Sequence, residues 1–181
     1  MSDLNNLNNS KAFTVPKNGL RFFSTLFRSD LYQHKEIIDL YIDNFQIKNY
    51  YYFHHSFIPQ AEYYSKEMGK QGSLKKLFVI DLDSFDREDL YKQKLIAVDI
   101  ENKNSDNGRK INIDPGLITL ENVLLSSGKN YAHRVYIRDG VFYELELIFK
   151  ANKCEELPWT YPDYKDEKIK ELFILARQSL L

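Results

Sequence analysis

A two-residue turn, Asp139-Gly140, separates two runs of alternating apolar and polar residues, and it constrains the fold more than any other feature. Asp-Gly favours the tight turn whose twist matches that of paired strands, so the flanking runs predict a β-hairpin over residues 132–149. The chain should therefore contain an antiparallel sheet. An unbroken ladder would pair Arg138 with Val141, Ile137 with Phe142, Tyr136 with Tyr143, Val135 with Glu144, Arg134 with Leu145 and His133 with Glu146.

Other segments also have strand-like patterns. Leu20 to Phe27 carries apolar side chains on both faces, which predicts a central strand covered on both sides. The runs Tyr50 to Phe57 and Leu77 to Leu82 favour two more strands. A short extended piece, Ile111 to Ile113, should be stopped by the turn-forming sequence Asp114-Pro115-Gly116.

Two helices are indicated by apolar residues at spacings of three and four. Asp30, with Gln33 three positions on, can cap the first, whose apolar face is His34, Ile37, Ile38, Tyr41, Ile42 and Phe45. Asp163 can cap the C-terminal helix, whose apolar face is Ile169, Leu172, Phe173, Ala176 and Leu180. Residues 94–102 stay open: Asp86 to Asp89 resembles a helix start, yet Leu95 to Ile100 also suits a strand.

These elements predict one α+β domain over residues 19–181, with a mainly antiparallel sheet and helices packed on it. A length of 181 residues fits a single domain. Residues 1–18 are rich in asparagine and lack apolar periodicity, so we expect a flexible tail.

Composition excludes several classes of function. The 25 lysines and arginines balance 26 aspartates and glutamates, which argues against coating of nucleic acid by bulk charge. The single cysteine, Cys154, favours a reducing cytoplasm and leaves no set of cysteines for a metal site, so no metal is predicted. No apolar run approaches membrane-spanning length, so no membrane partner is expected. The sequence around Gly128-Lys129 is not a phosphate-binding P-loop, because Val123 and Asn130 occupy positions that need glycine and Ser or Thr.

His133 is the first candidate for chemistry. The predicted register places it opposite Glu146, with Glu144 on the same strand face, and a carboxylate in that place can orient a general acid or base. Arg134 could then hold an anionic group from the other face. A salt bridge between strands, with no chemistry, is the alternative.

The segment Leu157 to Tyr164 presents three aromatic side chains between two prolines. Trp159 and Tyr161 could stack against a base or a sugar, or they could only attach the last helix to the sheet. If Asp163 does not cap that helix, it is the expected hydrogen-bond acceptor of the Tyr161 hydroxyl.

Three motifs, in order and spacing, resemble a prokaryotic family known only as domain of unknown function 4416 (DUF4416). They are Ile111 to Gly116, Lys129 to Arg134 and Leu157 to Tyr164. Tyr63-Tyr64 to Glu67-Met68-Gly69 is similar to an upstream block of that family, so the likeness extends from about Leu20 to Leu175. Leu117, where the family pattern has tyrosine, and Ser126-Ser127-Gly128, in place of a threonine-rich step, depart from it.

The resemblance implies a compact single domain but no activity or cofactor. It adds a set of polar or aromatic motif positions that a core does not need: Glu67, Asn112, Asp114, His133, Arg134, Glu144, Trp159, Tyr161 and Asp163.

From these residues we expect a cytoplasmic protein that binds a small or phosphate-bearing ligand. His133 and Glu67 would be the catalytic groups of any reaction, and Asn112, Asp114, Arg134, Glu144, Trp159, Tyr161 and Asp163 would bind the ligand. Whether the protein is an enzyme, and with which cofactor, stays open. The alternative is a non-enzymatic module that binds RNA or a protein through the aromatic segment.

Overall fold

Strand β1 (Gly19–Arg28) lies at the centre of the sheet in the computed structural model, which describes residues 14–55, 64, 67–68, 73–106 and 108–181. It pairs antiparallel with β3 (Leu74–Phe85) on one side and with β4 (Ile111–Ile118) on the other. Phe22 packs into one hydrophobic core and its neighbour Phe23 into a second core on the opposite face. The prediction of a central strand covered on both sides is confirmed.

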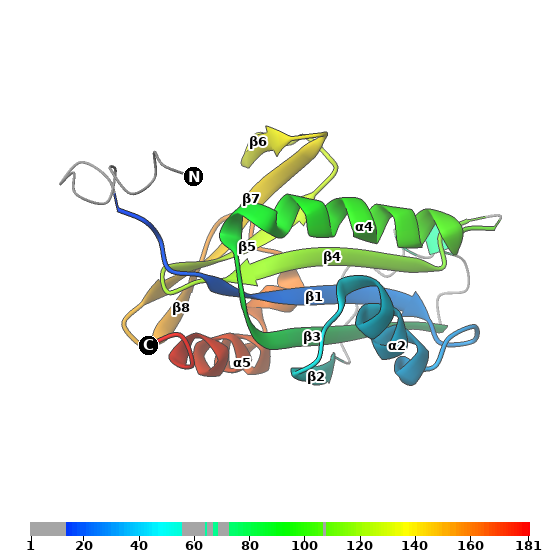
Figure 1. Ribbon diagram of the computed structural model, residues 1–181, viewed down its shortest axis with the longest axis horizontal. Helices are drawn as coiled ribbons and strands as arrows, with labels where there is room; N and C mark the ends of the chain where they lie inside the picture. The colour runs from blue at the N-terminus through cyan, green and yellow to red at the C-terminus, as the bar shows by residue number, and fades with distance from the viewer. Residues whose placement is uncertain (1–13, 56–63, 65–66, 69–72, 107) are drawn as a thin grey trace.

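All the strands described belong to one antiparallel sheet, in the order β2-β3-β1-β4-β5-β7-β6, with β8 also paired to β7 (Figure 1). The remaining strands are β2 (Tyr50–His55), β5 (Asn122–Ser127), β6 (Arg134–Arg138), β7 (Val141–Lys150) and β8 (Lys153–Glu156). The strand expected from Tyr50 to Phe57 is observed as far as His55, and residues 56 and 57 lie outside the described part of the chain.

Helices cover both faces of this sheet. Helices α2 (His34–Phe45) and α4 (Leu90–Lys103) pack on the core that contains Phe23, and α5 (Glu167–Gln178) packs on the core that contains Phe22. Two short 3-10 helices, η2 (Arg87–Asp89) and η3 (Pro162–Lys165), precede α4 and α5. This is the single α+β domain that the sequence predicts. No helix in the described ranges has the length and apolar character needed to span a bilayer.

The open question at residues 94–102 is answered by α4. The carboxylate of Asp86 accepts a hydrogen bond from the main-chain nitrogen of Glu88 at 2.9 Å, and the helical turn that starts there continues into α4. Leu90, Ala97 and Ile100 are buried at helical spacing.

Both predicted helix caps are wrong by three residues. Helix α2 follows Gln33, whose main-chain N–H donates to Glu36, while Asp30 is paired with Arg28. Helix α5 follows Asp166, whose carboxylate accepts from the main-chain nitrogen of Lys168 at 2.8 Å. In each case a short turn intervenes between the predicted cap and the helix, and a second capping residue begins the helix after it.

The predicted stop at Asp114-Pro115-Gly116 is also wrong, because β4 continues through it to Ile118. Pairing between β4 and β5 covers only Gly116 to Ile118, so Pro115 lies where the two strands separate and no ladder hydrogen bond is lost. Its carbonyl accepts a hydrogen bond from the Ser126 hydroxyl at 2.6 Å. The sheet is therefore open between β4 and β5 on the Asp114 side of this proline.

The hairpin has the predicted turn but a different register. Asp139 and Gly140 have φ of 51° and 77°, and Arg138 pairs with Val141 as expected. A bulge at Ile137 then pairs Tyr136 with Phe142 and Arg134 with Glu144, so every predicted pair from Ile137–Phe142 to His133–Glu146 is wrong by one residue. The bulge brings Arg134 directly opposite Glu144.

Replacing Gly140 by alanine tests the turn. Its φ is in the left-handed region and no atom lies within 4 Å of an added Cβ, so the cost comes from backbone strain alone. We expect Gly140→Ala to lower the free energy of unfolding by about 1–2 kcal/mol in urea denaturation. Gly128→Ala, which also has open space but no positive φ, is the control and should change it by less than about 0.5 kcal/mol. Equal effects of the two substitutions would contradict the turn.

Replacing Gly116 by alanine tests the close approach of β1, β4 and β5. An added Cβ would overlap the ring of Phe22 and lie 2.6 Å from the carbonyl oxygen of Leu124. Backbone and a buried ring cannot both retreat, so Gly116→Ala should lower the unfolding free energy by at least about 2–3 kcal/mol. A melting temperature equal to that of the unaltered protein would show that the strands are not packed this closely.

Candidate functional site

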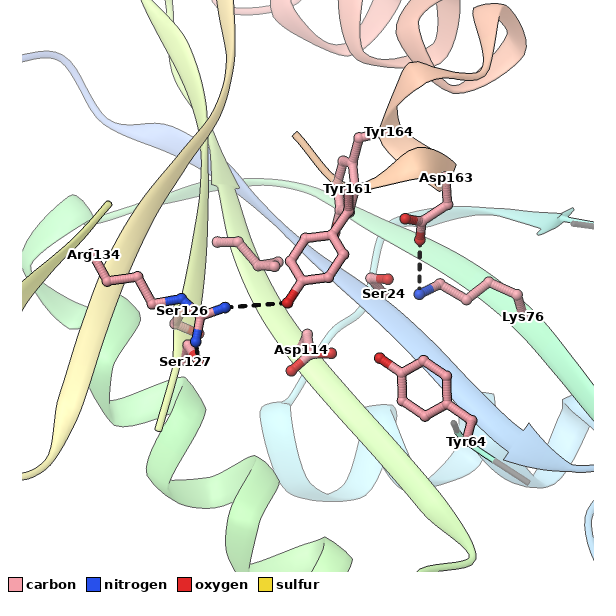
Figure 2. A pocket seen from close by; sticks show the side chains of 11 residues that line it. Ser24, Tyr64, Lys76, Asp114, Ser126, Ser127, Arg134, Tyr161, Asp163 and Tyr164 are labelled. Atoms are coloured by element: carbon pink, nitrogen blue, oxygen red, sulfur yellow. Dashed lines mark hydrogen bonds and ion pairs between the residues drawn. The ribbon is translucent and has the colours of Figure 1, made fainter. Parts of the chain in front are cut away.

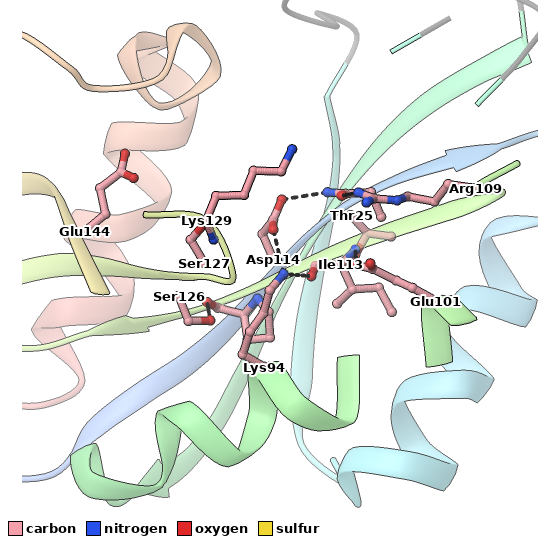
Figure 3. Close-up of polar contacts among 12 residues, drawn as sticks. Thr25, Lys94, Glu101, Arg109, Ile113, Asp114, Ser126, Ser127, Lys129 and Glu144 are labelled. Carbon is pink, nitrogen blue, oxygen red and sulfur yellow. Dashed lines mark hydrogen bonds and ion pairs between the residues drawn. The ribbon is translucent and has the colours of Figure 1, made fainter. Parts of the chain in front are cut away.

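A cavity of about 780 Å³ opens where β4 and β5 separate, between α4, the connection from β5 to β6 and the segment 159–162. Figure 3 shows Lys94 of α4, Asp114 of β4, Ser127 at the end of β5 and Lys129 in the connection after it around this cavity. A smaller cavity of about 50 Å³ shares Asp114, Arg134 and Tyr161 with it (Figure 2). The larger volume is in the range of small-molecule binding sites.

The residues that the sequence analysis selected come together at this place. Seven of them line the larger cavity: Glu67, Asn112, Asp114, His133, Arg134, Trp159 and Tyr161. Asp163 lines the smaller one, and Glu144 lies behind the wall, in contact with His133 and Arg134. Sequence reasoning missed Lys94, Glu101, Arg109 and Lys129, which also line the larger cavity.

Side chains of α4 replace the strand that is missing beside β4. The main-chain N–H of Ile113 donates to Glu101 at 2.6 Å, and its carbonyl accepts from the Lys94 ammonium at 2.8 Å. Burial raises the pKa of Glu101, although the charge of Lys94 and the bond from Ile113 oppose this. The sequence does contain a sign of these two residues. Lys94 and Glu101 lie at helical spacing with Leu90 and Ala97, on a buried helix face where apolar side chains are expected.

Asp114 is held in its charged form beside this edge. It accepts hydrogen bonds from Lys94 at 2.9 Å and from the Asn112 amide at 2.7 Å, and Asn112 in turn accepts from Arg109. Burial acts to raise the pKa of Asp114, but the charges of Lys94 and Lys76 and the two hydrogen bonds outweigh it and lower the pKa. The cavity therefore has a fixed negative charge on β4.

Arg134 connects three walls of the cavity. Its guanidinium donates to Glu144 on β7 and to the carbonyl of Lys129 at 3.0 Å. It also donates to the Ser127 hydroxyl at 2.9 Å and to the Tyr161 hydroxyl at 3.1 Å (Figure 2). Only 6% of its side chain is exposed. Most of its five donors are already used, so Arg134 holds the cavity in shape and has little left for an anion.

His133 and Trp159 form the aromatic part of the wall. Their rings are stacked, with centroids 5.4 Å apart and planes at 12°, and Tyr131 lies beside His133. The indole N–H of Trp159 donates to the carbonyl of Leu145 at 2.8 Å, and the residue is 38% exposed. The His133 Nε2 atom lies 3.5 Å from a carboxylate oxygen of Glu144, in place of the predicted Glu146.

Glu144 and Glu146 are two fully buried carboxyl groups on one face of β7, with Arg134 as the cation in contact with Glu144. One oxygen of Glu146 accepts from the main-chain N–H of Tyr161 at 3.1 Å. Burial, the hydrogen bond with Glu144 and its charge raise the pKa of Glu146 to about 9, with a smaller contribution from Asp163. At neutral pH Glu146 is therefore a carboxylic acid that shares its proton with the Glu144 carboxylate.

The structure contradicts two of the roles predicted for Asp163, the cap of the last helix and the acceptor of the Tyr161 hydroxyl. Asp166 caps α5, and the Tyr161 hydroxyl contacts Arg134. Asp163 is buried and forms an ion pair of 2.9 Å with Lys76 of β3, which Figure 2 shows at the edge of the smaller cavity. It thus links η3 to the sheet.

Glu67 also lines the cavity. Its carboxylate lies 4.0 Å from Arg109, and its main-chain carbonyl accepts from the Arg109 N–H at 3.3 Å. The catalytic role of Glu67 stays a prediction. Within the described ranges, no group of three or more metal-ligating side chains is close enough to hold an ion.

Fold and cavity define a one-domain α+β protein with a charged internal site. Residues 18–180 match the family model of the domain of unknown function DUF4416, so the chain belongs to this family. Comparison with curated proteins and with solved structures found no match.

Replacing each of the two buried glutamates, Glu144 and Glu146, by glutamine should change the unfolding free energy in opposite directions. The folded protein keeps the Glu146 proton up to about pH 9, whereas the unfolded chain loses it near 4.5. The stability linked to this proton is complete below the unfolded pKa and is lost as the pH rises toward the folded value. Glu146→Gln, which mimics the acid form, should therefore raise the unfolding free energy at pH 8 by about 1–3 kcal/mol and flatten its pH dependence.

Glu144→Gln is the matched substitution on the same strand face. It removes the carboxylate from the buried guanidinium of Arg134 and should lower the unfolding free energy by about 3 kcal/mol at the same pH. Denaturation curves of both variants between pH 5 and 9 provide the measurement. A Glu146→Gln protein that is less stable at pH 8 than the unaltered chain would contradict the shared proton.

Proposed function

We propose that this protein binds a small anionic ligand, of the phosphate-bearing class, in the cavity between β4 and β5. The observation that carries the proposal is a cavity of about 780 Å³ walled by charged and aromatic side chains from separate parts of the chain. Burying so many charged groups around an open volume costs stability, and such costs are typical of functional sites.

Basic side chains of the cavity offer partners to an anion. Lys94, Arg109 and Lys129 line it, and a fourth, Arg134, is balanced by Glu144 behind the wall. Three carboxyl groups, Glu67, Glu101 and Asp114, line it as well, but Asp114 is paired with Lys94 and Glu101 accepts from the main-chain N–H of Ile113. A negative group of a ligand can contact the ammonium of Lys129, whereas its uncharged part can pack against the stacked rings of the aromatic wall.

Polar groups on β4 supply orientation. Asn112 and Asp114 lie two residues apart on one strand face and are fixed by Arg109 and Lys94, so they offer rigid partners for ligand hydroxyl or amine groups. The single cysteine favours a reducing compartment, and we place this binding in the cytoplasm.

Tryptophan fluorescence tests the proposal directly, because Trp159 is the single tryptophan of the chain and lines the cavity. Ribose 5-phosphate, nucleoside monophosphates, inorganic phosphate, unphosphorylated ribose and a short RNA would be titrated against the protein. We expect phosphorylated small molecules to change the emission with saturation, and unphosphorylated ribose to bind at least about tenfold more weakly.

Two variants give this titration its controls. Lys129→Gln removes a positive charge from the cavity and should weaken binding of the phosphorylated ligand by about tenfold or more, whereas Lys150→Gln, which is 65% exposed on β7, should leave it unchanged. If no small molecule changes the emission, or if both variants behave alike, the proposal fails.

The alternative, a module that binds RNA or a protein, has support from a different surface. Tyr131, Val135 and Tyr136 are each more than half exposed at the start of the β6 hairpin. Trp159, the centre of the predicted platform, supports it less, because its N–H is bonded and one ring face is stacked on His133. Saturable binding of the short RNA alone in the titration above would favour this alternative.

A further inference from the structure

The paired carboxyl groups of β7 have no role in ligand binding as proposed above, since they lie behind the cavity wall. Glu144 and Glu146 are 1% and 0% exposed, and each has one carboxylate oxygen with no hydrogen-bond donor in the described structure. A proton held on Glu146 leaves the pair with one negative charge, which Arg134 balances. The raised pKa of Glu146 agrees with this arrangement.

Glu144 also contacts a residue of the cavity wall, His133. Glu144 faces the Nε2 atom of His133 at 3.5 Å, and His133 lines the cavity with 22% of its side chain exposed. A carboxylate at Nε2 favours the tautomer with the proton on Nε2, so Nδ1 carries the lone pair and can accept a proton. The ring of Trp159 stacks on the imidazole and fixes the orientation of its plane. The charged or titratable groups around the imidazole are Glu144, Glu146 behind it, Arg134 and Tyr131.

We propose that His133 transfers a proton to and from the bound ligand, with Glu144 as its positioning residue, and that the ligand is a phosphorylated carbonyl compound. The inference rests on the proposed function, because it requires an anionic small molecule in this cavity. Nδ1 of His133 takes a proton from the hydroxyl-bearing carbon next to the carbonyl. The C–H electron pair forms the C=C bond of an enediolate, and the carbonyl π pair moves to oxygen. Return of the proton to the same carbon completes an exchange. Its return to the former carbonyl carbon, with transfer of the hydroxyl proton from one enediolate oxygen to the other, completes an isomerisation, and neither path needs an oxidant or reductant.

Two features of the cavity favour this class of reaction over covalent catalysis. Among the described residues that line it, the hydroxyl of Ser127 already accepts hydrogen bonds from Arg134 and from the main-chain nitrogen of Lys129, so it is not placed as a nucleophile. Lys94 donates to Asp114 and to the carbonyl of Ile113, and a third ammonium proton can stabilise negative charge that develops on a carbonyl oxygen.

Hydrogen–deuterium exchange detects this step without knowledge of the product. Dihydroxyacetone phosphate, ribose 5-phosphate and glucose 6-phosphate would be incubated with the full chain in D₂O, and the loss of the C–H signal next to the carbonyl followed by proton NMR. We expect at least one of them to exchange about 100-fold faster than in buffer. Its unphosphorylated counterpart should exchange far more slowly.

Three variants assign the roles. His133→Gln should abolish the exchange while ligand affinity, measured by calorimetry, changes by only a few fold. Glu144→Asp keeps the charge and should retain part of the rate, whereas Glu144→Gln should lower the rate without a matching change in ligand affinity, because the neutral amide no longer fixes the proton of the imidazole on Nε2. If Glu144→Gln fails to fold, the rate and ligand affinity of Glu144→Asp and the His133→Gln result still decide the assignment.

The outcomes separate this inference from the proposed function. Saturable binding of all three compounds without exchange would overturn the proton transfer and leave ligand binding intact. Exchange that persists in His133→Gln would overturn the assignment of the base. Absence of both binding and exchange would overturn the two proposals together. The control variant is Lys150→Gln, far along β7, which should match the unaltered protein in every assay.

Discussion

The main-chain groups of Ile113 would be unpaired if α4 did not reach them. Between Ile111 and Pro115 the strand β4 has β1 on one side and no strand on the other, because its pairing with β5 begins only at Gly116. A buried N–H or carbonyl without a partner costs about 1–3 kcal/mol, so an open edge inside a protein must be covered. Glu101 and Lys94 provide an acceptor and a donor in the positions that a strand would have supplied. The cavity exists because side chains have taken the place of a strand.

The local parts of this fold were predictable from the sequence. Asp139-Gly140 indicates its turn because both residues must have positive φ, and the apolar run from Leu20 indicates a central strand because both of its faces are covered. The bulge at Ile137 was not predictable, because nothing distinguishes its side chain from that of a regularly paired residue. Pro115 was misread as a stop because its tolerance depends on where a distant strand, β5, separates from β4.

The candidate site was predictable to the extent that polar residues occur in motifs. Asn112, Asp114, His133, Trp159 and Tyr161 do line one cavity. Lys94 and Glu101 were missed because α4 was ambiguous between helix and strand, and a charged residue on a helical face has meaning only once the helix is established. Arg134 was expected to bind an anion from the face opposite the acidic residues, but the altered register turned it toward Glu144.

The bulge at Ile137 has a consequence for how this hairpin can change in length during evolution. In a strand, neighbouring side chains point to opposite faces, so the face on which Arg134 lies depends on whether the number of residues between it and the turn is odd or even. The extra residue at the bulge sets this parity and puts Arg134 on the side of Glu144, Ser127 and Tyr161. Insertions or deletions of two residues between Arg134 and Asp139 preserve the parity, whereas a change of one residue turns the guanidinium away from all three partners.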